Sequence, residues 1–138
     1  MLYVFTGADP IATRARAHGF LDGFVAKGAR VEHIDADVCS VALLRDRAGA
    51  RSLFLPEGAS EMILLDTPGE RVEALEAVIA LAEELAKSPN IFILLEGKLL
   101  APITKELKNH ATEYHEIQGN AVAEKFNVFA LGDALVRR

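Results

Sequence analysis

A glycine-containing turn follows the first hydrophobic run of the chain, where a mononucleotide-binding fold would carry its phosphate loop. The sequence there is TGADPIATR over residues 6–14. A phosphate loop needs a second glycine and a lysine, so that backbone N–H groups and an ammonium can meet the phosphates. Ala12 stands where that glycine would be, no lysine is present, and Asp9 would repel a phosphate. The segment is more typical of a capped turn that leads into a helix.

Asp66 follows the apolar run Met62–Leu65, at the position of the magnesium-binding acid of ATPases. Thr67 comes next, where a catalytic carboxylate would be expected, so Asp66 and Thr67 are predicted to cap the following helix. A different interpretation joins Asp9, Asp66 and Lys98, which all follow predicted strands, where α/β sites form. This set is similar to a phosphoryl-accepting receiver domain, although Asp9 has no second acid beside it. A nucleotide- or phosphoryl-binding domain, ATPase-like or receiver-like, is therefore the alternative function.

The other nucleophilic and metal-ligating side chains form no recognisable pattern. The histidines are dispersed, with no spacing that converges on a metal, and Cys39 has no CxxC partner. No Ser-His-acid or paired-carboxylate arrangement follows from the spacing. The sequence thus predicts no catalytic residues, no metal and no cofactor, with Cys39 as a packed thiol. The histidines are His18, His33, His110 and His115.

Two large apolar residues, Leu53 and Phe54, stand between polar neighbours just before the central hydrophobic run. Arg51 and Ser52 precede them and the turn-forming residues 56–58 follow, so the pair is predicted to project as a hydrophobic tip. A projecting aliphatic-aromatic pair is the kind of anchor that fills a pocket on a partner protein. Burial in the core is the competing interpretation, because Leu and Phe are more often inside than outside.

Short hydrophobic runs alternate with helical patterns along the whole chain, which at 138 residues has the length of one domain. Strands that alternate with helices predict an α/β fold with a mostly parallel sheet of about five strands and helices on both faces. The predicted strands cover residues 2–5, 30–34, 62–65, 91–95 and 112–117. The predicted helices cover residues 10–27, after the cap Asp9, and residues 70–87, with Val72 on the buried face. Another predicted helix starts at Asp35 or Asp37 and carries Val38, Val41, Leu43 and Leu44. The last two cover residues 102–109 and 126–138.

The composition excludes several classes of protein. With 51% hydrophobic and 25% charged residues, the chain fits a folded domain and not a disordered one. A formal charge of −5 argues against a nucleic-acid surface, which needs clustered Lys and Arg. The apolar runs fall short of the roughly 18 to 20 residues that cross a bilayer, and a single cysteine suits a reducing compartment. We therefore expect a cytoplasmic protein that contacts neither nucleic acid nor membrane.

In sequence order, several segments resemble the delta subunit of the bacterial DNA polymerase III clamp loader. The opening at residues 3–10 is similar to the family's strand-Gly-x-Asp-Pro start, and Ser52-Leu53-Phe54 precedes a hydrophobic strand. Residues 91–96 are followed by Lys98-Leu99, and residues 105–108 precede a further strand. Residues 126–135 resemble the helix that opens the family's third domain. No one of these matches is specific, and the resemblance rests on their order.

The resemblance implies a first domain with an AAA+-like, degenerate P-loop ATPase fold in three layers that has lost nucleotide binding. It implies that Ser52, Leu53 and Phe54 bind the sliding clamp, the beta ring, during DNA replication, and other clamp-loader subunits are further expected partners. Residues 1–120 would form the ATPase-like domain, and residues 121–138 the start of the third domain. Family members are much longer, and here the segment similar to the third domain follows almost directly after the first domain. The resemblance therefore implies either a fragment or a shortened relative in which the second domain is missing, and it does not establish that the chain joins a full loader.

Overall fold

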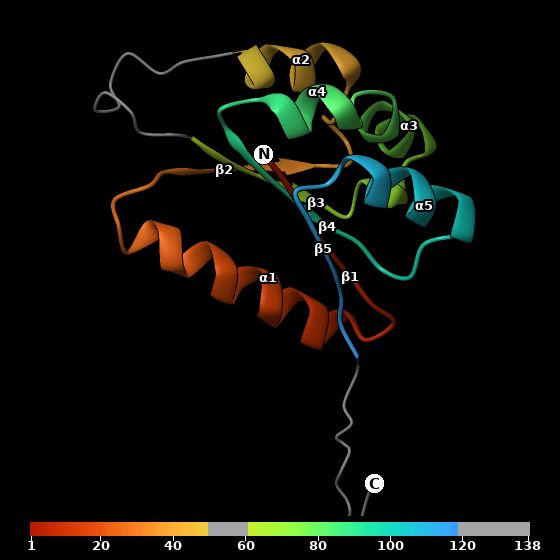
Figure 1. The fold of residues 1–138 in the computed structure, drawn as a ribbon, viewed down its shortest axis with the longest axis horizontal. Coiled ribbons are helices and arrows are strands. Elements are labelled where there is room, and N and C mark those ends of the chain that lie inside the picture. Colours follow the sequence, from red (N-terminus) through yellow and green to blue (C-terminus); the bar gives the residue numbers. More distant parts are fainter. Residues whose placement is uncertain (50–60, 119–138) are drawn as a thin grey trace, which may run out of the picture.

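The structure is a computed structural model that describes residues 1–49 and 61–118. Five parallel strands form one sheet in the order β2-β3-β4-β1-β5 (Figure 1). The chain has the α/β fold that the sequence predicts. The strands are β1 (Leu2–Thr6), β2 (Val31–Asp35), β3 (Met62–Asp66), β4 (Ile91–Leu95) and β5 (Glu113–Glu116). The helices are α1 (Pro10–Val25), α2 (Val41–Gly49), the 3-10 turn η1 (Pro68–Glu70), α3 (Val72–Ala80), α4 (Ala82–Lys87) and α5 (Ala101–His110).

Helices cover both faces of the sheet, as Figure 1 shows: α1 lies on one face, and α2 to α5 lie on the other. Successive strand residues point to opposite faces, so each strand supplies both layers of the core. In β3, Ile63 and Leu65 pack toward the larger helical layer, while Met62 and Leu64 pack toward α1. Strand β4 alternates in the same way and is buried throughout. This two-sided burial explains why both strands are continuous apolar runs.

The edge strands have a different composition. Strand β2 lies beside β3 alone and is largely exposed, with Ile34 as its buried residue. Strand β5 lies at the other edge, beside β1, and none of its four residues is fully buried. Polar and charged residues are therefore accommodated on both edges of the sheet.

The start of α1 follows the prediction, whereas that of α2 does not. The Asp9 carboxylate accepts hydrogen bonds from the backbone N–H groups of Ile11 and Ala12, at 3.0 and 3.2 Å. Helix α2 begins at Val41, and the Ser40 hydroxyl accepts from the N–H of Leu43 at 3.1 Å. The prediction that Asp35 or Asp37 starts this helix is wrong, because Asp35 is the last residue of β2 and Asp37 lies in the turn that follows it.

The helix predicted over residues 70–87 is divided. Helices α3 and α4 are separated at Leu81, whose backbone angles (φ −104°, ψ 9°) are not helical. Thr67 has a left-handed backbone (φ 45°) and makes no capping hydrogen bond, so the predicted cap by Asp66 and Thr67 is wrong. Val72, predicted on the buried face, is 69% exposed. The division lets α3 and α4 each turn their small residues, such as Ala77 and Ala82, toward the sheet.

Two predictions lie outside the described residues. Ser52, Leu53 and Phe54 fall within residues 50–60, and the predicted C-terminal helix falls within residues 119–138. Among the described helices, none combines the length and apolar character that would let it cross a membrane.

Candidate functional site

A polar cluster lies at the carboxyl end of the sheet, where the loops after parallel strands gather. Its centre is Asp66, the last residue of β3, whose side chain is 11% exposed. Arg14 on α1 donates to both carboxylate oxygens of Asp66, from Nη1 at 3.0 Å and Nη2 at 2.9 Å. His33 Nε2 lies 2.8 Å from Asp66 Oδ2, and the Thr67 hydroxyl donates to Oδ1 at 3.1 Å. These contacts join α1, β2 and β3.

The environment of Asp66 strongly favours the ionised carboxylate. Hydrogen bonds from Arg14 are the largest cause, and together with those from His33 and Thr67 they outweigh burial and lower the pKa of Asp66 to about 2. An acid of this kind is negatively charged throughout the physiological pH range. It therefore does not serve as a proton donor or acceptor near neutral pH.

One group of described residues is close enough to share a metal ion. Ligand atoms of His33, Asp35 and Asp66 lie within 4.8 Å of one another, and Asp35 pairs with Asp66 in the register of β2 and β3. His33 and Asp35 are exposed, and both oxygens of Asp66 already accept from Arg14. A cation here would have to compete with the guanidinium for the same carboxylate.

The turn after β1 is occupied by its own side chains. The backbone N–H groups that could meet a phosphate at the start of α1 donate instead to the Asp9 carboxylate. Gly7 leaves no space beside it, because a Cβ there would stand 2.5 Å from the carbonyl oxygen of Ile117 and 2.6 Å from Thr13 Oγ1. The Asp9 carboxylate thus occupies the N–H groups that would bind a phosphate, and Arg14 occupies the carboxylate that would bind a cation.

Glu96, directly after β4, is the buried acid of this end of the molecule, with 7% exposure. Its carboxylate accepts hydrogen bonds from the N–H groups of Gly69 and Gly97. Burial is the largest influence and raises the pKa of Glu96, while the two N–H donors act in the opposite direction. Glu96 fixes the loop after β3 against the loop after β4.

The three residues of the receiver-like hypothesis have separate surroundings. Asp9 caps α1, Asp66 pairs with Arg14, and Lys98 lines a hollow along α5. The strand order also differs from the order 2-1-3-4-5 of flavodoxin-like receiver folds, because β1 here lies between β4 and β5.

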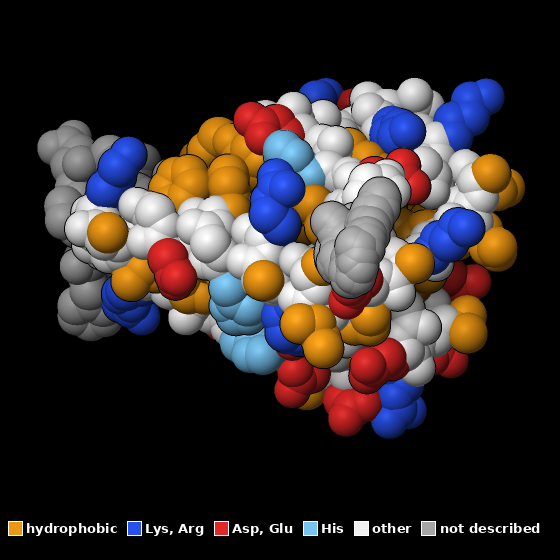
Figure 2. Space-filling view, turned by 90° about the horizontal axis from the view of Figure 1, so that it is seen from below, with side chains coloured by type: hydrophobic (Ala, Val, Ile, Leu, Met, Phe, Trp, Pro, Cys, Tyr) orange, Lys and Arg blue, Asp and Glu red, His pale blue; other side chains and the backbone are white. Residues whose placement is uncertain are grey.

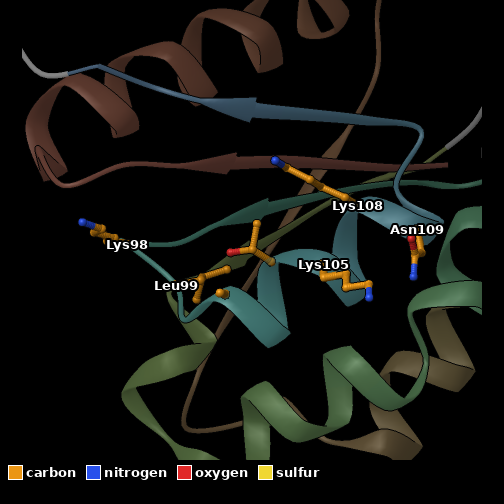
Figure 3. A pocket seen from close by; sticks show the side chains of 7 residues that line it. Lys98, Leu99, Lys105, Lys108 and Asn109 are labelled. Atoms are coloured by element: carbon orange, nitrogen blue, oxygen red, sulfur yellow. The ribbon is translucent and has the colours of Figure 1, made fainter.

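The hollow that Lys98 lines, of about 570 Å³, lies along α5 (Figure 3). Three lysines line it, Lys98, Lys105 and Lys108, together with residues that include Leu99 and Asn109. Lys108 Nζ lies 5.2 Å from the centre of the Tyr114 ring. In Figure 3 the ends of the three lysine side chains point away from one another, so their ammonium groups do not converge on a single anion.

At the opposite end of the sheet, one turn holds both flanks of residues 50–60. Asn90 Nδ2 donates to the carbonyl of Arg47 at 2.8 Å, and the Ser88 hydroxyl donates to the carbonyl of Ala48 at 2.6 Å. On the other flank, the N–H of Glu61 donates to Asn90 Oδ1 at 3.2 Å. Ser88 and Asn90 are both buried. The turn between α4 and β4 therefore connects the end of α2 to the start of β3.

The ion pair of Arg14 with Asp66 and the role of Asn90 are the functional features that sequence reasoning missed. The sequence offers a signal for Asp35, because a parallel register of β2 and β3 places it beside Asp66 where both strands end, but it offers none for Arg14. No comparable sequence signal marks Asn90, which resembles any turn residue before a strand.

No model of a known protein family matches the sequence, and no curated protein matches it either.

Proposed function

We propose that this protein is a non-catalytic relative of the clamp-loader delta subunit that binds the DNA polymerase sliding clamp through Ser52, Leu53 and Phe54. The observation that carries the proposal is that the chain is held in place on both sides of residues 50–60. The buried turn at Ser88 and Asn90 donates hydrogen bonds to the chain just before this segment and accepts one from the chain just after it. Such fixed flanks lower the entropy cost of presenting an anchor to a pocket.

The arrangement of the strands supports the same proposal. The order β2-β3-β4-β1-β5 places β4 between β1 and β3 in a parallel sheet, which is compatible with the α/β domain that the resemblance implies. Residues 50–60 come between α2 and β3, so a tip there would lie at the amino end of the strands. That end is opposite the edge at which an ATPase-like fold would bind nucleotide.

The lack of catalysis is part of the proposal and is supported by the polar cluster. A phosphate would have to displace Asp9 from the N–H groups of α1, and a magnesium ion would have to displace Arg14 from Asp66. Nucleotide or phosphoryl binding stays the alternative. It predicts that millimolar ATP with magnesium raises the melting temperature, whereas we expect no shift.

The direct test measures binding of the purified sliding clamp from the same source to the chain and to a Leu53→Ala/Phe54→Ala variant. Interface anchors typically contribute about 2 kcal/mol or more each, and loss of even one such anchor corresponds to about 30-fold in affinity, so we expect the double variant to lose at least that much. Circular dichroism and thermal unfolding should show that it remains folded.

A matched control is the double variant Ile11→Ala/Leu100→Ala, which also removes two exposed apolar side chains but at the other end of the sheet. We expect it to bind the clamp normally. Unfolding of the Leu53/Phe54 variant would support the core interpretation, and undiminished clamp binding by it would refute the proposal.

A further inference from the structure

The hollow along α5 combines exposed lysine side chains with apolar ones. Lys98, Lys105 and Lys108 are exposed, and the described residues that line the hollow include no acid. On the face of the molecule that α1 covers, by contrast, Figure 2 shows basic side chains spread among acidic and hydrophobic ones. The hollow is therefore a local positive region on a chain whose formal charge is −5.

The charge of these lysines is not compensated within the described part of the chain. None of the three ammonium groups forms an ion pair with a residue in the ranges 1–49 and 61–118. Glu106, the acid of α5, instead has its carboxylate 3.4 Å from His110 Nε2. Lys108 lies over the ring of Tyr114, a contact that restrains the ammonium without neutralising it. Three positive charges are thus available to an acidic ligand.

The apolar part of the lining lies among the lysines. Leu99 is half-buried and packs against the core, and in the view of Figure 3 it lies between Lys98 and Lys105. Ala101 and Thr104 also line the hollow. Positions 101, 104, 105 and 108 recur at spacings of three and four residues, so small and basic side chains share one side of α5. The volume of about 570 Å³ is within the usual range of ligand pockets.

We propose that the hollow along α5 binds an acidic segment of a partner protein, with an apolar side chain of that segment in the hollow and carboxylates on either side paired with the lysines. The lysine side chains end in different directions, so a single phosphate or carboxylate cannot contact all three (Figure 3). A segment with several Asp or Glu residues carries its charges at separate positions and can meet each lysine. The flexible stem of lysine lets each ammonium adjust to a carboxylate.

Other occupants fit the hollow less well. Nucleic acid is bound by larger clusters of Lys and Arg, whereas the described lining has three lysines and no arginine. The net negative charge of the chain also repels a long polyanion. A second copy of this chain in a symmetric contact would place lysines against lysines. The lining includes none of residues 50–60, so this proposal is independent of clamp binding and is tested on other residues.

The test is a titration of the ¹⁵N-labelled chain, followed by NMR, with a peptide of about eight residues in which aspartates flank a central leucine. A second peptide has asparagine in place of every aspartate, and a third has alanine in place of the leucine. We expect saturable shifts of the amides in residues 98–109. The asparagine peptide should bind about tenfold more weakly, because several exposed ion pairs are lost, and the alanine peptide about threefold or more. High salt should weaken only the peptides that carry aspartate.

Variants assign the binding to the hollow. Lys98→Gln/Lys105→Gln should weaken the aspartate peptide about fivefold or more and leave the asparagine peptide unchanged. Both lysines are exposed, so the variant should remain folded, as its amide spectrum will show. Lys27→Gln/Lys87→Gln is the matched control, because it removes the same net charge from exposed lysines outside the hollow. It should bind both peptides normally.

Four results would overturn the proposal. The first is the absence of saturable shifts up to about 5 mM aspartate peptide, a concentration above the Kd expected of a weak specific contact. The second is equal weakening by the two double variants, which would indicate long-range attraction only. The third is tighter binding at residues 98–109 by inorganic phosphate or by a short oligothymidylate. The fourth is the same set of shifts on concentrating the chain alone, which would assign the hollow to self-association.

Discussion

Replacement of Asp66 by asparagine tests how much the Arg14 ion pair stabilises the fold. The pKa of Asp66 falls from 3.8 to about 2, a difference of about 1.8 units. At 1.36 kcal/mol per unit this would correspond to about 2.4 kcal/mol. Because the Arg14 side chain is 45% exposed, solvent screens the pair, and we expect about 1 kcal/mol.

The sign of the pH dependence follows from the lowered pKa. The folded state holds Asp66 ionised more strongly than the unfolded state does, so the extra stability is present above pH 3.8 and is lost as the pH falls through about 2. The free energy of unfolding, measured by urea denaturation between pH 2 and 6, should therefore differ between wild type and Asp66→Asn at pH 6. The two proteins should converge near pH 2.

Glu96 acts in the opposite direction, because its raised pKa favours the protonated form in the folded state. Both proteins are best compared in a Glu96→Gln background, in which the amide oxygen still accepts from Gly69. Asp22→Asn, an exposed change on α1, serves as the control for the loss of one surface carboxylate. A difference that is constant with pH, or an NMR titration that places the pKa of Asp66 at 3.8 or higher, would refute the reasoning.

Two further predictions concern packing and the flanks of residues 50–60. Gly7→Ala should lower the free energy of unfolding by about 2 kcal/mol or more, because the new Cβ would lie 2.5 Å from a backbone oxygen. Gly19→Ala, with open space around it on α1, should raise the free energy of unfolding by about 0.5–1 kcal/mol. Chemical denaturation distinguishes the two variants, and equal effects would contradict the close contact at Gly7. Asn90→Ala should cost about 1–3 kcal/mol and speed hydrogen exchange at the Glu61 amide, because that N–H loses its acceptor; an unchanged exchange rate there would show that the bond is dispensable.

The sequence predicted the sheet well because both faces of its central strands are covered. Residues 62–65 and 91–95 are uninterrupted apolar runs, which is the pattern expected of a strand that is buried on both sides. Asp9 with Pro10 marked the start of α1 for an equally local reason, since the cap bonds to N–H groups within three residues. Such local signals are independent of the rest of the fold.

The polar cluster could not be predicted in the same way. Arg14 and Asp66 are 52 residues apart, and either residue alone is compatible with an exposed helix face or a cap. The pairing depends on how α1 lies across the sheet, which no short sequence pattern determines. Val72 was misplaced for a related reason: the helical period was correct, but the division at Leu81 and the turn before α3 changed the side that faces the core.

The turn at Ser88 and Asn90 also has a consequence for how the chain tolerates change in length. Once its two flanks are fixed, a loop is closed whatever its length, and doubling the number of residues costs only about 0.6 kcal/mol of closure entropy. Insertions between Gly49 and Glu61 would therefore leave the sheet nearly as stable as before. This position is therefore suited to the insertion of a foreign recognition peptide.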